Sequence, residues 1–237
     1  MTEVDKPRTS LSEAAYQRLR SDILSCRLAP GQRLSERQLA ADTGFGTATL
    51  RAALTRLGQD GLVRTQPRSG YQVTPLTPKS IGDLLDVWGV VAPELIRRGH
   101  RAATPQQHQR IFEAFEEINR IRCDAIDMTT IVRLVGLLDD AFAALAAATG
   151  NDYFLGLVRR LSGDLARTWV IVWSVEPSAV LIGDGGLLAE INTEVDADVL
   201  AERAREDIAA FRQRVLDLVS RWPSVAGSAI DVLDTRA

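Results

Sequence analysis

The chain has 237 residues, of which 46% are hydrophobic and 25% charged, and its formal net charge at pH 7 is −3. This length exceeds that of one average domain and predicts two, and the composition is typical of a soluble globular protein. No apolar run approaches the roughly 18 residues that a membrane helix needs, and residues 1–10 lack the apolar core of a signal peptide, so we expect a cytoplasmic protein with no membrane partner.

Residues 11–34 predict a first helix. Leu11, Ala15, Leu19 and Ile23 recur at helical spacing on one face, and Pro30 with Gly31 stops the pattern. The only two cysteines of the chain stand in apparently helical segments, which favours reduced buried thiols over a disulfide. These cysteines are Cys26 and Cys123.

Residues 34–63 predict a helix-turn-helix, because two short helical patterns flank a tight glycine turn. The second pattern has an apolar stripe formed by Leu50, Ala53, Leu54 and Leu57. Small, hydrogen-bonding and basic residues occupy the opposite side, which suits a helix in the DNA major groove. These residues are Ala48, Arg51, Thr55, Arg56 and Gln59. An ordinary amphipathic helix with a solvated face is the alternative.

Residues 62–73 predict a β-hairpin directly after that helix. Gly61 ends the helix, and Pro67, Ser69 and Gly70 form a turn between two short strands. Arg64 and Arg68 make the hairpin basic. A helix-turn-helix followed by a basic hairpin is a winged helix, in which the second helix reads base edges while the wing and helix N-termini hold phosphates.

The charge distribution agrees with a DNA partner for this part of the chain alone. Residues 1–76 hold 11 Lys and Arg against 7 Asp and Glu, whereas residues 77–237 hold 17 against 24. A basic first part beside an acidic second part predicts a polyanionic partner for the first. The acidic balance of the whole chain therefore does not argue against DNA binding.

Residues 10–74 resemble the DNA-binding domain of the GntR family of bacterial transcription regulators. The shared segments, in order, are AYQRLRSDIL, LAPGQRLSERQLA, LRAALTRLGQDGLV and RSGYQV. Where the family usually has a Val-Ser-Arg-Thr-Pro-like run, residues 45–49 read Phe-Gly-Thr-Ala-Thr, so Thr47 replaces an arginine that often contacts bases. The resemblance implies that Arg37, Thr49 and Arg51 touch DNA. The predicted DNA-contacting residues are Arg33, Arg37, Thr47, Thr49, Arg51, Thr55, Arg56, Arg64, Arg68 and Gly70.

The second part of the chain predicts an all-α bundle. Pro75 and Pro78 mark the boundary, with Thr77 able to cap a new helix. Helices are expected at about 78–102, 105–122, 129–149, 151–174, 178–193 and 196–220. The predicted fold is therefore mainly α, a winged helix-turn-helix followed by a helical bundle. The predicted domains are an N-terminal tail at 1–9, the winged helix at 10–76, an effector-binding and dimerisation domain at 77–222 and a C-terminal tail at 223–237.

Residues 137–157 and 195–211 resemble the helical effector domain, called FCD, of the fatty-acid-regulator-like branch of this family. Many such domains hold a divalent metal between one Asp and three His. Asp139 matches the Asp, but Ala143, Leu188 and Asp207 stand where the histidines are expected, and the chain has only His100 and His108, which lie elsewhere. Three imidazoles cannot come from two, so no metal or other cofactor is predicted. A weak site for a hard cation at Asp139 and Asp207 is the alternative.

Trp88 stands where this branch commonly has an arginine that binds the effector. An indole in place of guanidinium and imidazole groups predicts an apolar site for a neutral or cationic effector. Trp169 and Trp173, one turn apart, are expected to join it, although these tryptophans could equally fill the core. The predicted effector-binding residues are Trp88, Asp139, Ala143, Trp169, Trp173, Leu188 and Asp207.

Together these patterns predict a sequence-specific transcription regulator, by family habit a repressor, that acts on double-stranded DNA as a homodimer and senses a small molecule. A regulator with a degenerate pocket is one alternative. A small-molecule enzyme on a helical scaffold is another. No catalytic residues are predicted, because Asp139 and Asp140 are adjacent on a helix and point about 100° apart, with no accompanying histidine or reactive cysteine.

Overall fold

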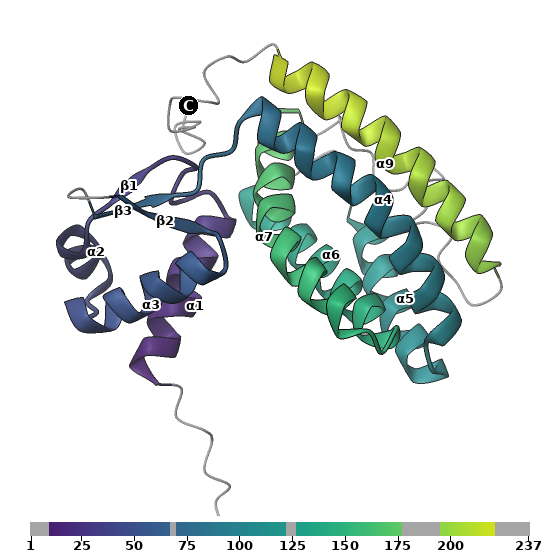
Figure 1. Cartoon of the computed structure of the whole chain (residues 1–237), viewed down its shortest axis with the longest axis horizontal. Helices are drawn as coiled ribbons and strands as arrows, with labels where there is room; N and C mark the ends of the chain where they lie inside the picture. Colours follow the sequence, from purple (N-terminus) through teal and green to yellow (C-terminus); the bar gives the residue numbers. More distant parts are fainter. Residues whose placement is uncertain (1–9, 67–69, 122–126, 177–194, 221–237) are drawn as a thin grey trace, which may run out of the picture. The chain divides into compact units, whose positions relative to one another are not determined.

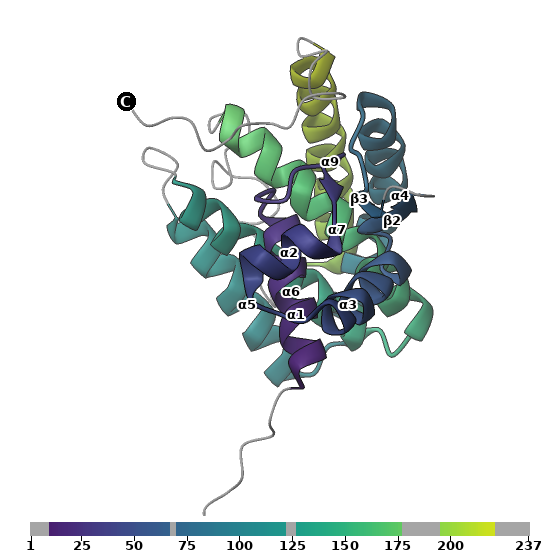
Figure 2. The same cartoon turned by 90° about the vertical axis from the view of Figure 1, so that its left-hand side faces the viewer.

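A computed structural model describes residues 10–66, 70–121, 127–176 and 195–220. The chain divides into two compact units, residues 1–75 and 76–237 (Figures 1 and 2). The first unit combines helices with a small sheet and the second is helical, which confirms the predicted fold class.

The described residues of the first unit, 10–66 and 70–75, form three helices and a three-stranded antiparallel sheet of order β1-β3-β2. Val63 pairs with Val73 and Thr65 pairs with Tyr71 across the hairpin. The sequence patterns did not indicate the two-residue β1, which pairs with β3. The elements are α1 (Leu11–Leu24), β1 (Arg33–Leu34), α2 (Glu36–Thr43), α3 (Thr47–Gln59), β2 (Val63–Gln66) and β3 (Gly70–Val73).

Local capping chemistry sets the helix ends in this unit. The Ser10 and Ser35 side chains cap α1 and α2, each accepting a backbone N–H at 3.1 Å. Gly44, with a φ of 76°, ends α2 in the left-handed conformation that glycine adopts without strain. The helices bury one shared apolar core, in which Leu19, Leu50 and Leu54 are almost fully covered.

The expectation that Cys26 lies in a helix was wrong. Helix α1 ends at Leu24, and Cys26 follows with a φ of 56°, buried and without a disulfide. The chain folds back here, because the Leu28 N–H donates to the Asp22 carbonyl at 2.9 Å. Cys123 lies outside the described residues.

The helices of the second unit start at strong capping signals. Thr77 and Ser80 form a reciprocal capping box ahead of α4, and Thr104 and Gln107 form another ahead of α5. The predicted helix at 178–193 falls outside the described ranges. The elements are α4 (Pro78–Ala102), α5 (Pro105–Arg120), α6 (Met128–Ala148), α7 (Asp152–Val175) and α9 (Ala197–Ser220).

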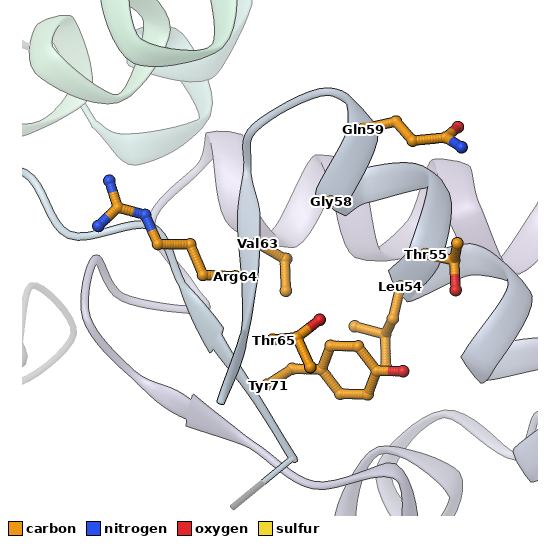
Figure 3. A pocket seen from close by; sticks show the side chains of 8 residues that line it. All are labelled: Leu54, Thr55, Gly58, Gln59, Val63, Arg64, Thr65 and Tyr71. Carbon is orange, nitrogen blue, oxygen red and sulfur yellow. The ribbon is translucent and has the colours of Figure 1, made fainter. Parts of the chain in front are cut away.

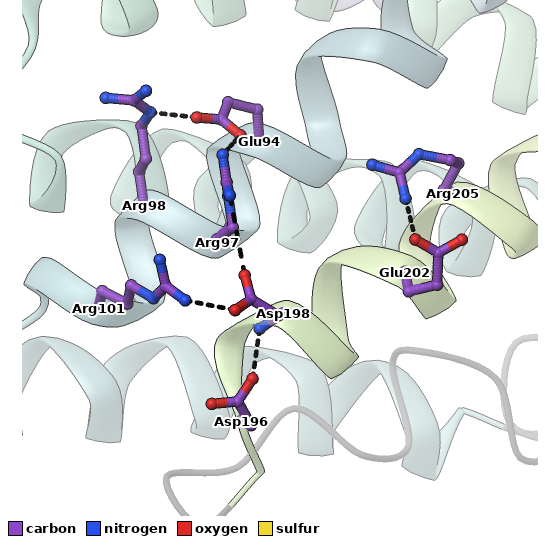
Figure 4. Close-up of polar contacts among 8 residues, drawn as sticks. All are labelled: Glu94, Arg97, Arg98, Arg101, Asp196, Asp198, Glu202 and Arg205. Carbon is purple, nitrogen blue, oxygen red and sulfur yellow. Dashed lines mark hydrogen bonds and ion pairs between the residues drawn. The ribbon is translucent and has the colours of Figure 1, made fainter.

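Helices α4 and α9 lie side by side in the second unit (Figures 1 and 2). Their antiparallel course follows from two ion pairs: Arg101 meets Asp198 at 2.6 Å near one end, and Arg212 meets Asp86 at 2.6 Å nearer the other. Figure 4 shows the first of these contacts, where Arg97 also approaches Asp198 at 3.8 Å. Such exposed pairs fix the register of two helices more than they stabilise them.

Candidate nucleic-acid interface

Helix α3 presents a polar, exposed side. The predicted stripe of Leu50, Ala53, Leu54 and Leu57 is buried, so this prediction is confirmed. The opposite side is open to solvent, where Thr47, Ala48, Arg51, Thr55, Arg56 and Gln59 are all exposed. A narrow helix with hydroxyl, amide and guanidinium groups on one face is able to enter a major groove and contact base edges or phosphates.

Arg51 is held by Glu36, a contact that the sequence analysis did not foresee. The Arg51 guanidinium donates from Nε to Glu36 Oε1 at 2.9 Å and from Nη2 to Oε2 at 2.7 Å. This hydrogen bonding holds the pKa of the Glu36 carboxyl below its usual range and raises the pKa of Arg51. The pair joins the first turn of α2 to α3, so the Arg51 side chain has a fixed orientation.

Arg56 is engaged on another side of α3. It donates to Glu13 of α1, and its guanidinium carbon lies 3.7 Å from the centre of the Tyr16 ring. The Tyr16 hydroxyl in turn donates to Asp60 at 2.7 Å. Hydrogen bonds from Gln17 and then Arg56 lower the pKa of Glu13. Arg56 therefore helps to hold α1 against α3, and its contact with DNA stays a prediction.

The other predicted DNA-contacting residues are spread around the first turns of α2 and α3 and along the hairpin. Arg33 on β1, Arg37 on α2 and Arg64 on β2 are exposed, whereas Thr49 is half-buried. The Thr55 hydroxyl donates to the Arg51 carbonyl at 2.9 Å. Arg68 lies outside the described residues.

Gly70 has a structural reason to be glycine. Its φ is 84°, and a Cβ at this position would lie 2.8 Å from the Leu34 carbonyl oxygen. The close approach belongs to the pairing of β1 with β3, which the structure shows between Leu34 and Tyr71. Glycine therefore permits the third strand to join the hairpin.

A hollow of about 430 Å³ lies between α3 and the hairpin (Figure 3). Threonine hydroxyls, the Tyr71 ring and two apolar side chains surround it, and the eight lining residues include no carboxylate. Thr65 and Tyr71 were not among the predicted residues, because strand alternation alone does not reveal which face of a hairpin meets a helix. The lining residues are Leu54, Thr55, Gly58, Gln59, Val63, Arg64, Thr65 and Tyr71.

The predicted effector residues occupy several helices of the second unit. Trp88 of α4 is buried, with the Phe142 ring of α6 edge-on at 4.8 Å. Trp169 lies 4.8 Å from Trp173 and stacks on Phe211 of α9 at 4.1 Å. The other predicted positions differ in exposure: Asp139 and Ala143 are half-buried on α6, Asp207 is exposed on α9, and Leu188 lies outside the described residues.

Helix α7 buries two polar groups, the Arg167 guanidinium and the Trp173 indole N–H. The Arg167 side chain is fully buried, paired with Asp164 and donating from Nε to the Gly163 carbonyl at 3.3 Å. Arg167 was not among the predicted residues, although an arginine inside an apolar run indicates a buried charge. Trp173 is also fully buried, and its indole Nε1 has no hydrogen-bond acceptor among the described residues.

The histidines form a pair at the junction of α4 and α5. The rings of His100 and His108 lie 4.7 Å apart, edge to face. Burial, and then the neighbouring His100, lower the pKa of His108. In the part of the chain that the structure describes, no three His, Cys, Asp or Glu side chains gather closely enough to hold a metal ion. No helix there is long and apolar enough to cross a membrane.

The geometry of the first unit defines a winged-helix DNA-binding domain. Residues 11–73 match the family model described as bacterial regulatory proteins, gntR family. The first unit is thus a DNA-binding domain of the GntR type, the class found in transcription regulators.

Individual relatives agree with this class. The chain is 32% identical over 110 residues to the uncharacterized HTH-type transcriptional regulator BphR of Paraburkholderia xenovorans, covering 46% of this chain and 45% of that protein. It is 30% identical over 147 residues to an uncharacterized HTH-type transcriptional regulator in an unstable DNA locus of Streptomyces ambofaciens, covering 53% of this chain and 62% of that protein. These matches span less than two thirds of either relative.

Among solved structures, the fold resembles that of McbR/YncC from E. coli. The TM-score is 0.68 at 17% sequence identity, and the match covers 90% of this chain and 98% of that one. At this identity the likeness concerns the fold alone. The similarity of fold covers both the winged helix and the helical second unit.

Proposed function

We propose that the chain is a sequence-specific transcription repressor that binds a two-part operator in double-stranded DNA and responds to a small-molecule effector. The observation that carries the proposal is the exposed polar side of α3, with Arg51 fixed by Glu36, in a GntR-type domain. Such a protein acts in the cytoplasm, where its operator lies. Occupying a promoter excludes polymerase, so repression is the simplest consequence of binding. No enzymatic activity is proposed.

Assembly as a homodimer supports useful affinity. One winged helix makes few base contacts. Joining two DNA-binding domains in a dimer multiplies the affinity for an operator with two half-sites, without any new kind of contact. The second unit has apolar side chains to spare on α4, where Val87 is 45% and Val90 76% exposed. We assign the dimer contact to this unit.

The helical unit is proposed to be an FCD-type effector domain that works without a metal. Its effector residues are the aromatic Trp88, Trp169 and Trp173 together with Asp139, Ala143, Leu188 and Asp207. The Trp173 N–H supports a ligand that is largely apolar but carries one hydrogen-bond acceptor, since an unpaired buried donor costs about 1–3 kcal/mol. Ligand binding would shift the population of dimer states that fit the two half-sites.

A second candidate is a regulator whose helical unit binds no effector and which answers only to its own concentration. The stacking of Trp169 on Phe211 at 4.1 Å favours it, because these rings fill space in the bundle by themselves. The two candidates share the DNA-binding function and differ in the helical unit.

DNA selection from a random pool, with the purified full chain, tests the regulator proposal. We expect enrichment of a two-fold symmetric sequence whose half-sites are spaced by about 10 base pairs or a multiple of it. A pool that shows no enriched sequence after repeated rounds would reject sequence-specific binding.

The effector proposal is tested separately by metal analysis and tryptophan fluorescence. We expect no stoichiometric zinc or nickel, no release from the selected DNA by small dicarboxylates or sugar acids, and a fluorescence change with a neutral apolar ligand found by screening. One tightly bound transition-metal ion per chain, lost in Asp139→Ala, would overturn the metal-free site. Release by a dicarboxylate would overturn the apolar site.

A further inference from the structure

We propose that the hollow between α3 and the hairpin holds one sugar-phosphate strand of the operator, with the hydroxyls of Tyr71 and Thr65 donating to a phosphate that Arg51 also contacts. The inference rests on the proposed DNA-binding function. It assigns a role to two residues outside the predicted contact set and to the space between two elements rather than to either element alone.

The geometry of duplex DNA requires a strand in this place. The major and minor grooves of B-DNA are separated by a single sugar-phosphate strand. When α3 lies in the major groove and the hairpin reaches the adjacent minor groove, that strand must pass between them. The hollow of about 430 Å³ is the space between these two elements.

The lining has the chemistry that such a strand needs. Thr65 and Tyr71 are cross-strand partners, so their side chains share one face of the hairpin, the face toward α3. Thr55 adds a third hydroxyl from α3, and Leu54 and Val63, only 0% and 3% exposed, form the buried floor of the hollow (Figure 3). Gln59 and Arg64 also line the hollow, and in the same view the Arg64 guanidinium points away from Thr65 and Tyr71.

Arg51 supplies a positive charge from α3 one turn before Thr55, the lining residue whose hydroxyl donates to the Arg51 carbonyl. Hydrogen bonding to Glu36 is the main cause of the raised pKa of Arg51, so the guanidinium keeps its charge. Of the five N–H donors of an arginine, the Glu36 pair uses one on Nε and one on Nη2. The other three are therefore able to reach a phosphate while Glu36 keeps the side chain in place.

Tyr71→Phe tests the inference, because it removes one hydroxyl and keeps the ring. With DNA selected by the unchanged chain, we expect about tenfold weaker binding, the loss of one hydrogen bond to a charged group. The loss should be equal on operators of different base sequence, since phosphate contacts carry no base information. Tyr153→Phe is the matched control: this tyrosine is 90% exposed in the second unit, and its variant should bind as the unchanged chain does.

A methylphosphonate scan of the operator identifies the phosphate. Neutralising one particular phosphate should weaken operator binding by the unchanged chain. On that modified operator, the unchanged chain and Tyr71→Phe should bind with equal affinity. Thr65→Val provides a second variant in case the first unfolds, and it should weaken binding at the same phosphate. Folded variants that bind like the unchanged chain would overturn the inference while leaving DNA binding intact, whereas an unchanged chain that selects no DNA would reject the proposed function itself.

Discussion

Glu36 and Arg51 link the two helices of the helix-turn-helix through two parallel hydrogen bonds, of 2.9 and 2.7 Å. On the proposed function, Glu36 is a positioning residue: it orients the Arg51 side chain, which we expect to contact DNA. The acidic group lowers the local positive charge but limits the orientations of the guanidinium. Specificity benefits from the second effect, because a fixed arginine loses less entropy on binding.

Glu36→Gln should raise affinity for random DNA and reduce discrimination in favour of the operator. The substitution removes one negative charge and frees Arg51, while stability changes by only about 0–1 kcal/mol because the pair lies at the surface, with the Arg51 side chain 67% exposed. Competition binding with operator and random duplexes measures the ratio. Asp42→Asn, the same charge change elsewhere on α2, should leave discrimination nearly unchanged, and equal effects of both variants would contradict the positioning role.

Replacing Arg37 and Arg51 together by alanine should weaken operator binding strongly. Each arginine is expected to contribute about 1–3 kcal/mol through base or phosphate contacts, and the dependence of affinity on salt should become shallower. Titrations at several salt concentrations measure both effects. Arg120→Ala, which removes an equally exposed paired arginine from the second unit, serves as the control. Full binding by the double variant would refute the placement of α3 in the DNA groove.

Gly70→Ala should destabilise the first unit by about 1–3 kcal/mol, because φ is positive there and the new Cβ would meet the Leu34 carbonyl oxygen. Gly136→Ala, in the interior of α6 with no atom within 4 Å of its new Cβ, should instead stabilise the second unit by about 0.5–1 kcal/mol. Thermal unfolding of both variants measures whether the free energy of unfolding falls for Gly70→Ala and rises for Gly136→Ala. A neutral Gly70→Ala would mean that β1 does not pair with β3 in solution.

The second unit should lose stability as the pH falls below about 6.5. The folded pKa of His108 is lowered, so the unfolded chain binds more protons in the window between the folded value and the unfolded one. The contribution of His108 to the free energy of unfolding is fully present above this pH window and decreases as the pH falls through it. NMR titration of the two histidine rings measures the His108 midpoint, and His108→Phe should reduce the pH dependence. A midpoint at or above 6.5 would contradict the burial.

Sequence patterns located elements and caps well where the signal is local. The bounds of α4 follow from Thr77 with Pro78 at one end and Thr104 with Pro105 after the other. The buried stripe of α3 follows from its periodicity. Such signals act within a few residues, where backbone hydrogen bonding and amphipathicity are decided.

Contacts between residues of different elements could not be predicted from these local patterns. Glu36 and Arg51 are 15 positions apart, and Glu13 and Arg56 are 43 apart. The two-residue β1 is too short to show alternation, and it exists because β3 offers it partners. In the sequence Tyr71 is an ordinary aromatic residue of a strand, and only the packing of the hairpin against α3 places it in the hollow that we propose holds DNA.

The pairing of β1 with β3 has a mechanical consequence for signalling. Leu34 is joined to Tyr71 in the sheet, and the next residue, Ser35, caps α2. From this connection we infer that strands β2 and β3 and the two helices of the helix-turn-helix move as one body. A ligand in the helical unit then has little to gain by deforming this body. We expect the effector to change the spacing and tilt between two such bodies in the dimer. Operators with altered half-site spacing should therefore reverse the effect of the effector on DNA affinity.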